Sequence, residues 1–103
     1  GEILEKYKNK IINIHPSLLP KYGGKGMYGL KVHQAVFENG DKESGCTVHY
    51  VISNVDAGEI IAQDKVDISM AKSPEKIQKI VLEREWKLLP RVVKELIKKS
   101  INN

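Results

Sequence analysis

A chain of 103 residues with 41% apolar and 29% charged side chains has the balance of an ordinary globular domain, which excludes an intrinsically disordered chain. Lysine dominates its net charge of +4, and aromatic residues make up only 6%, so we interpret the charge as a solvated surface rather than a nucleic-acid-binding one. The single cysteine, Cys46, excludes a disulfide framework and a cysteine metal cluster, and the absence of a signal peptide or membrane-length apolar stretch predicts a cytoplasmic protein.

The first elements expected along the chain are a short helix and a strand. Apolar residues recur at helical spacing over residues 2–8, and residues 11–15 form an apolar run with the character of a central strand covered on both faces. Residues two apart in a strand share a face, so Asn13 and His15 should project into one space just before Pro16 ends the strand.

A glycine-rich loop over residues 22–29 precedes the middle elements. We expect a helix from Leu30 to Glu38, stopped by the turn residues at 39–41. Alternating residues then predict a strand from Cys46 to Ile52 and a second one from Ile60 to Ile68. The short connection between these strands predicts that they pair antiparallel.

The last third predicts one long helix. Ser73 is suited to the N-cap and Pro74 to the first helical position, and the apolar residues after them fall on one side. Pro90 falls on the polar side, whereas Glu85 falls near the centre of the apolar side. Because a buried carboxylate needs a partner, Glu85 should face either a polar group inside the fold or a hydroxyl or amine of a ligand.

Asn13, His15 and Asp56 are the residues best suited to chemistry. A histidine titrates near neutral pH, and a neighbouring carboxylate stabilises its protonated form. An imidazolium beside an amide can donate hydrogen bonds to a developing oxyanion, which suits acyl transfer to an amine. On residue types alone the competing interpretation is equally strong: His15 is a capping or core histidine, and Asp56 shapes a turn before Gly58.

The other candidate residues are less suited to catalysis or metal binding. His33 and His49 do not combine with His15 in any compact ligand spacing, so we expect no metal site. His49 lies within a strand pattern and should be a hydrogen-bonded histidine near the site. Cys46 has no basic neighbour in sequence and should be a small core residue.

Two motifs carry a family resemblance: residues 13–20 (NIHPSLLP) and residues 55–58 (VDAG). Together they resemble the folate-dependent formyltransferases, in particular the purine-biosynthetic members, and the resemblance runs over essentially the whole chain. The loop at 23–29 is similar to a variant found in part of that family. The resemblance implies an α/β fold, namely part of a Rossmann-like sheet with a strand pair and a long C-terminal helix.

The resemblance also implies a reaction, the transfer of a formyl group from 10-formyltetrahydrofolate to the amine of glycinamide ribonucleotide, with no metal. It assigns catalysis to Asn13 and His15, with Asn13 also contacting the substrate, and to Asp56 as the carboxylate that keeps the histidine protonated. Glu85 would bind the ribose hydroxyls of the substrate. The folate pterin would be held by backbone contacts along the segment made of Ile52, Ser53, Asn54, Val55 and Asp56.

The same family has a preceding α/β half that holds the substrate phosphate, and the resemblance places Gly1 just past it. We therefore expect residues 1–103 to be the C-terminal catalytic half and to be inactive, or nearly so, alone. The first strand should expose apolar surface that either the missing half or a self-associating copy covers. We expect small-molecule substrates and neither nucleic acid nor membrane as partners.

Three alternatives remain. Methionyl-tRNA formyltransferases usually follow Leu-Leu-Pro with an arginine-rich run, whereas Lys21-Tyr22-Gly23 stands here. Formyltetrahydrofolate deformylases usually have a second histidine at the position of Pro16. From a different class, the chain is a non-catalytic binding module that retains the fold.

Overall fold

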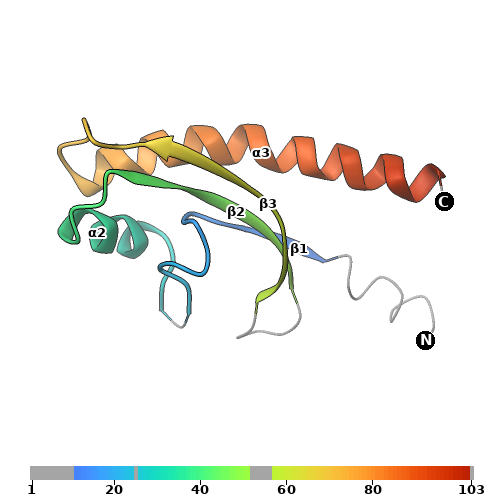
Figure 1. Ribbon diagram of the computed structural model, residues 1–103, viewed down its shortest axis with the longest axis horizontal. Coiled ribbons are helices and arrows are strands. Elements are labelled where there is room, and N and C mark those ends of the chain that lie inside the picture. The colour runs from blue at the N-terminus through green and yellow to red at the C-terminus, as the bar shows by residue number, and fades with distance from the viewer. Residues whose placement is uncertain (1–10, 25, 52–56, 103) are drawn as a thin grey trace.

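The computed structural model describes residues 11–24, 26–51 and 57–102. Its elements follow in the order β1 (Ile12–His15), α2 (Leu30–Glu38), β2 (Glu43–Val51), β3 (Ala57–Asp67) and α3 (Pro74–Asn102). The three strands form one antiparallel sheet in the order β1-β2-β3, as Figure 1 shows. The short helix expected over residues 2–8 lies outside the described residues.

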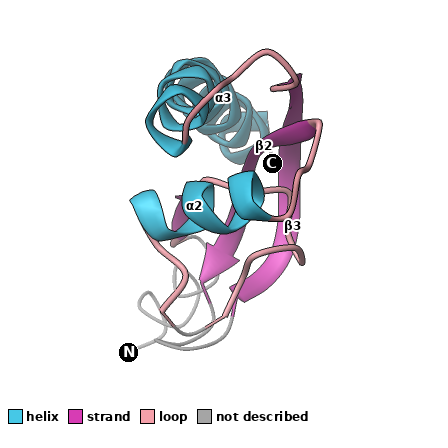
Figure 2. Ribbon diagram, turned by 90° about the vertical axis from the view of Figure 1, so that its left-hand side faces the viewer, coloured by secondary structure: helices cyan, strands magenta, loops and turns pink. Residues whose placement is uncertain are grey.

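Both helices pack against the same face of the sheet. Figure 2 shows α2 and α3 on one side of β2 and β3. Cys46 and Val48 of β2 point into this layer, which we call the helix-covered face; the face on the other side of the strands is called the loop face. The core contains nine buried apolar residues: Val32, Val36, Cys46, Val48, Ile68, Ile77, Val81, Leu88 and Val92.

Within the described residues β1 lies at the edge of the sheet and pairs with β2 only. The central, doubly covered position predicted for this strand stays a prediction, because it refers to a larger sheet; the described part agrees with the expectation that the strand exposes an apolar edge. Ile11, just before the strand, is 57% exposed, as expected for an apolar strand without a second neighbour.

The helix α2 has the predicted bounds. It ends where Gly40 takes a φ of 72°, with the Asn39 amide donating to the carbonyl of Ala35 and the Gly40 amide to that of Phe37. Its buried side differs from the prediction: His33 is 2% exposed, whereas Phe37, placed on the apolar side, is 41% exposed. Residues four apart on a helix share a face, so Val32 and Val36 form the buried stripe and His33 and Phe37 lie beside it. Only His33 is covered; Phe37, in the last turn of the helix, is not.

The strands β2 and β3 are antiparallel, as predicted, but each begins three residues earlier than its pattern indicates, at Glu43 and Ala57. The strand β3 ends at Asp67, one residue before the predicted end, and Ile52, the predicted end of β2, lies outside the described residues. Glu43 pairs with Asp67 and Val51 with Ala57. The three residues before Cys46 were not recognised as strand because Ser44 and Gly45 have low β-propensity; pairing with β3 overrides it.

The long helix α3 begins as predicted. The amide of Lys76 donates to Ser73 Oγ at 3.2 Å, which makes Ser73 the N-cap. The predicted apolar side is buried or partly buried, and Pro90 lies exposed inside the helix. Among the helices described, none has the combined length and apolar character that crossing a membrane requires.

Candidate functional site

Asn13 and His15 project from the same face of β1, as the strand alternation predicts. In the pairing with β2, Asn13 lies opposite His49 and His15 opposite Thr47. Paired residues in an antiparallel ladder share a face, so these four side chains all lie on the loop face. Asn13 is exposed and His15 is partly buried, which leaves an amide and an imidazole side by side at an accessible sheet edge.

The segment after β1 is fixed to the loop face by Thr47. This fully buried hydroxyl donates to the carbonyl of Ser17 at 2.7 Å and accepts from the amide of Leu19 at 3.0 Å. Gln63 Nε2 on β3 donates to the same hydroxyl at 3.0 Å and to the Leu19 carbonyl at 2.9 Å. The one donor and both acceptor sites of the Thr47 hydroxyl are therefore occupied, and these hydrogen bonds hold the turn that follows His15.

Sequence reasoning missed both Thr47 and His33 as part of this site. His33 is buried, and burial together with the positive charge of His15 lowers its pKa, so the two imidazoles lie within electrostatic range. The helical pattern of apolar residues did not indicate His33, because such a pattern marks apolar residues such as Val32 as inward-facing and leaves polar ones unmarked. His49 is a hydrogen-bonded strand histidine, as predicted, with Nδ1 2.9 Å from the carbonyl of Tyr50.

Asp56 and the proposed pterin segment, residues 52–56, lie outside the described residues. The ladder does fix where that segment leaves and rejoins the sheet, because Val51 pairs with Ala57. This point is four residues along β2 from Thr47, the partner of His15, or about 13 Å at 3.3 Å per residue. It is only two residues from His49, the partner of Asn13.

Glu85 lies on the helix-covered face, not on the loop face with Asn13 and His15. Its carboxylate lies close enough to the Cys46 thiol to raise the pKa of that thiol, and burial raises the pKa of Glu85 itself. Its neighbour Arg84 forms an ion pair with Asp64, with Nη1 and Oδ1 3.8 Å apart. The expectation that Glu85 falls on the apolar side of the helix is confirmed.

Cys46 is a core residue, as predicted, and it should make stability depend on pH. Burial, aided by the negative charges of Glu85 and Asp64, raises the pKa of the thiol from 9.0 to about 12. Above pH 9 the unfolded chain loses this proton while the folded chain keeps it, so the free energy of unfolding should fall by about 1.4 kcal/mol per pH unit.

Urea unfolding of wild type and Cys46→Ala between about pH 8 and 10 measures this effect. The substitution removes the thiol but none of the other groups that titrate in this range, so the variant should show a shallower loss of stability. Equal slopes for the two proteins would contradict the prediction.

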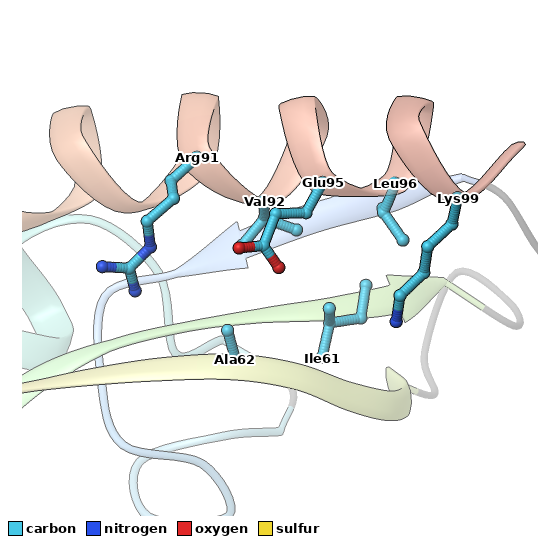
Figure 3. Close-up of a pocket in the computed structure, with 7 residues that line it drawn as sticks. All are labelled: Ile61, Ala62, Arg91, Val92, Glu95, Leu96 and Lys99. Atoms are coloured by element: carbon cyan, nitrogen blue, oxygen red, sulfur yellow. The ribbon is translucent and has the colours of Figure 1, made fainter. Parts of the chain in front are cut away.

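A cavity of about 350 Å³ lies between the C-terminal half of α3 and β3. In Figure 3 the side chains of Arg91, Glu95 and Lys99 reach from the helix toward the strand. Ile61 and Ala62 lie opposite them on β3. The cavity includes none of the candidate site residues. In the described ranges, the His, Cys, Asp and Glu side chains form no group of three that could hold a metal ion.

Comparison with known proteins places these features in a family. Residues 1–93 match the family model described as formyl transferase. A chloroplastic phosphoribosylglycinamide formyltransferase of Arabidopsis thaliana is 44% identical over 100 residues, which cover 97% of this chain and 34% of the relative. The phosphoribosylglycinamide formyltransferase of Haemophilus influenzae is 43% identical over 90 residues, covering 87% of this chain and 40% of the relative.

Solved structures give the same result for the fold. The phosphoribosylglycinamide formyltransferase of Anaplasma phagocytophilum superposes with a TM-score of 0.79 at 35% identity, covering 95% of this chain and 44% of that one. The mixed α/β architecture with an antiparallel strand pair and a long C-terminal helix is therefore confirmed. The chain spans about a third of the first curated relatives that it matches.

Proposed function

This chain belongs to the formyl transferase family, and on that premise we propose that it carries the catalytic side chains for formyl transfer from 10-formyltetrahydrofolate to the amine of glycinamide ribonucleotide. The observation that carries the proposal is the placement of Asn13 and His15 side by side on the loop face at the edge of the sheet. The names of the relatives, which are phosphoribosylglycinamide formyltransferases, support this choice of acceptor.

In the proposed reaction the substrate amine attacks the formyl carbon, and a carbon–nitrogen bond forms. Protonated His15 and the amide of Asn13 donate hydrogen bonds to the oxyanion of the tetrahedral intermediate. The attacking amine loses a proton, the bond to the folate nitrogen breaks, and that nitrogen leaves with a proton delivered through His15. No step requires a metal, because charge and proton are both handled by side chains.

Asp56 keeps His15 protonated in this proposal, directly or through a water molecule. The backbone of residues 52–56 holds the pterin of the folate cosubstrate. The positions where this segment joins β2 and β3 support a role at the loop face next to Asn13.

We further propose that these residues act with a part of the protein that corresponds to the remainder of the relatives. The chain covers 34% and 40% of two relatives' lengths, and Asn13 and His15 lie on a strand with one described neighbour. The phosphate of the substrate and part of the folate would then be held outside residues 1–103. A cytoplasmic location stays a prediction, since two plant relatives are named chloroplastic.

The purified chain of residues 1–103 should therefore show little or no formyl transfer by itself. Supplying the N-terminal part of the Haemophilus influenzae relative as a separate polypeptide should restore turnover, measured as loss of formyl folate in the presence of glycinamide ribonucleotide. Full turnover by the chain alone, after its mass has been verified, would contradict the proposed division of the site. Formate release without any amine acceptor would favour the deformylase alternative.

The proposed ribose contact of Glu85 gives a second test. Burial raises the pKa of Glu85, so its carboxylate costs stability above its ordinary pKa, and that cost disappears as the pH falls. Glu85→Gln should therefore leave the unfolding midpoint at pH 7 unchanged or higher. It should also raise KM for glycinamide ribonucleotide by about tenfold or more, because hydrogen bonds to a charged acceptor are lost.

The matched control is Glu83→Gln, which changes an exposed glutamate on the same helix. It should alter neither the unfolding midpoint nor KM. A Glu85→Gln protein with wild-type KM would remove Glu85 from the binding site and leave it as a structural carboxylate.

A further inference from the structure

Tyr22 joins the candidate catalytic histidine to the end of α2. Its backbone carbonyl lies 2.9 Å from Nε2 of His15. Its phenol donates a hydrogen bond to Oδ2 of Asp41 at 2.7 Å. Tyr22 also has a φ of 55°, a left-handed conformation that a bulky residue rarely adopts. Strained backbone of this kind persists only where surrounding contacts hold it.

Those contacts are present around Asp41. Its amide donates to the carbonyl of Val36 at 3.3 Å, and its Oδ1 accepts from Asn39 Nδ2 at 2.8 Å. Both carboxylate oxygens are therefore engaged, with one held by the turn that ends α2 and the other by the phenol. Burial and the bond to Asp41 raise the pKa of Tyr22, which keeps the phenol protonated as a donor.

A carbonyl oxygen can only accept a hydrogen bond, so Nε2 of His15 must carry the hydrogen in this contact. That condition holds whether the imidazole is neutral or protonated. The proton that the ring gains and loses must then be the one on Nδ1. The hydrogen bond made by one ring nitrogen fixes the role of the other.

We propose that Tyr22 is a positioning residue. Its backbone carbonyl accepts the hydrogen bond of Nε2 of His15, which leaves Nδ1 as the nitrogen that exchanges a proton in formyl transfer. This inference rests on the proposed catalytic role of His15, but the tautomer itself is a property of the folded chain. The alternative is that Tyr22 only closes the turn after β1. A purely structural Tyr22 would not control the tautomer of His15.

The tautomer is measured by nitrogen-15 NMR of the histidine side chains at a pH where His15 is neutral. In wild type, His15 should be almost entirely the Nε2–H tautomer, with a ring N–H proton protected from exchange. Tyr22→Phe removes the bond to Asp41, so the tautomers should mix and this proton should exchange about three- to tenfold faster, as expected for one lost hydrogen bond. The matched control, Tyr28→Phe, changes a tyrosine that is 66% exposed and should match wild type.

Two further variants keep the test decisive if Tyr22→Phe does not fold. Asp41→Ala removes the acceptor of the phenol and should mix the tautomers in the same way, whereas Asp41→Asn retains a carbonyl oxygen and should restore the wild-type spectrum. A wild-type Nδ1–H tautomer, or a wild-type spectrum in Asp41→Ala, would overturn the inference.

Kinetics separate this inference from the proposed function. They are measured in the complemented enzyme, which is the chain of residues 1–103 together with the N-terminal part supplied as a separate polypeptide. Tyr22→Phe should lower kcat about three- to tenfold and leave KM for both substrates nearly unchanged. Full turnover in a His15→Ala variant would defeat the proposed function, yet the NMR result would still decide whether Tyr22 holds the ring. An unchanged kcat in Tyr22→Phe together with mixed tautomers would overturn the assignment of Nδ1 as the nitrogen that exchanges the proton.

Discussion

Replacing His15 with alanine should lower kcat for formyl transfer by about 10²- to 10⁴-fold, the range typical for loss of a general acid or base. In the proposed mechanism the substitution also removes one hydrogen-bond donor to the oxyanion, so the effect should fall toward the upper part of that range. KM should change much less, because the imidazole acts on the transition state. The measurement is steady-state turnover in the complemented enzyme, with both substrates varied.

The fold should survive this change. His15 is partly buried, and within the described part of the chain its ring makes one hydrogen bond, to the carbonyl of Tyr22. Circular dichroism and urea unfolding of His15→Ala should therefore resemble wild type to within about 1 kcal/mol. His49→Gln, which changes an imidazole on the neighbouring strand and the same face, is the matched control and should keep most of its activity. An unchanged rate in His15→Ala would favour the non-catalytic binding module instead.

Asn13 and His15 illustrate what strand alternation can predict. A period of two places Asn13 and His15 on one face without further information, and the structure confirms this. The same alternation could not predict which face the long helix covers. That choice depends on Cys46 and Val48 packing against α2 and α3, and it puts Glu85 on the opposite face from the pair.

The helix α2 was predictable to the residue because glycines mark both of its ends: Gly29 precedes it, and Gly40 follows with a φ of 72°. The start of β2 was not predictable from the sequence, because no local signal marks Ser44 and Gly45 as strand. Their conformation comes from pairing with Val66 and Lys65, about 20 residues further along the chain. Tertiary contacts likewise account for Thr47, whose partners Ser17 and Leu19 are distant in sequence.

Gly45→Ala should destabilise the fold by about 3 kcal/mol or more, at or above the upper end of the usual cost of overpacking. Gly45 is buried on β2, and a Cβ atom there would collide with the backbone carbonyl oxygen of Asp64 on β3. It would also lie 2.7 Å from Cδ2 of Leu18, in the turn that follows His15. Leu18 can move aside, but the carbonyl belongs to the β2–β3 ladder, so the strands must separate.

Urea unfolding followed by circular dichroism measures this loss, and Ser44→Ala is the matched control one residue earlier. Ser44 is buried, and its Oγ has no hydrogen-bond partner among the described residues, so removing the hydroxyl should leave stability unchanged or raise it. Because the Gly45→Ala collision reaches Leu18, the variant should also lose activity under conditions where it remains folded. A Gly45→Ala protein with wild-type stability would mean that β2 and β3 do not approach each other as closely as their ladder requires.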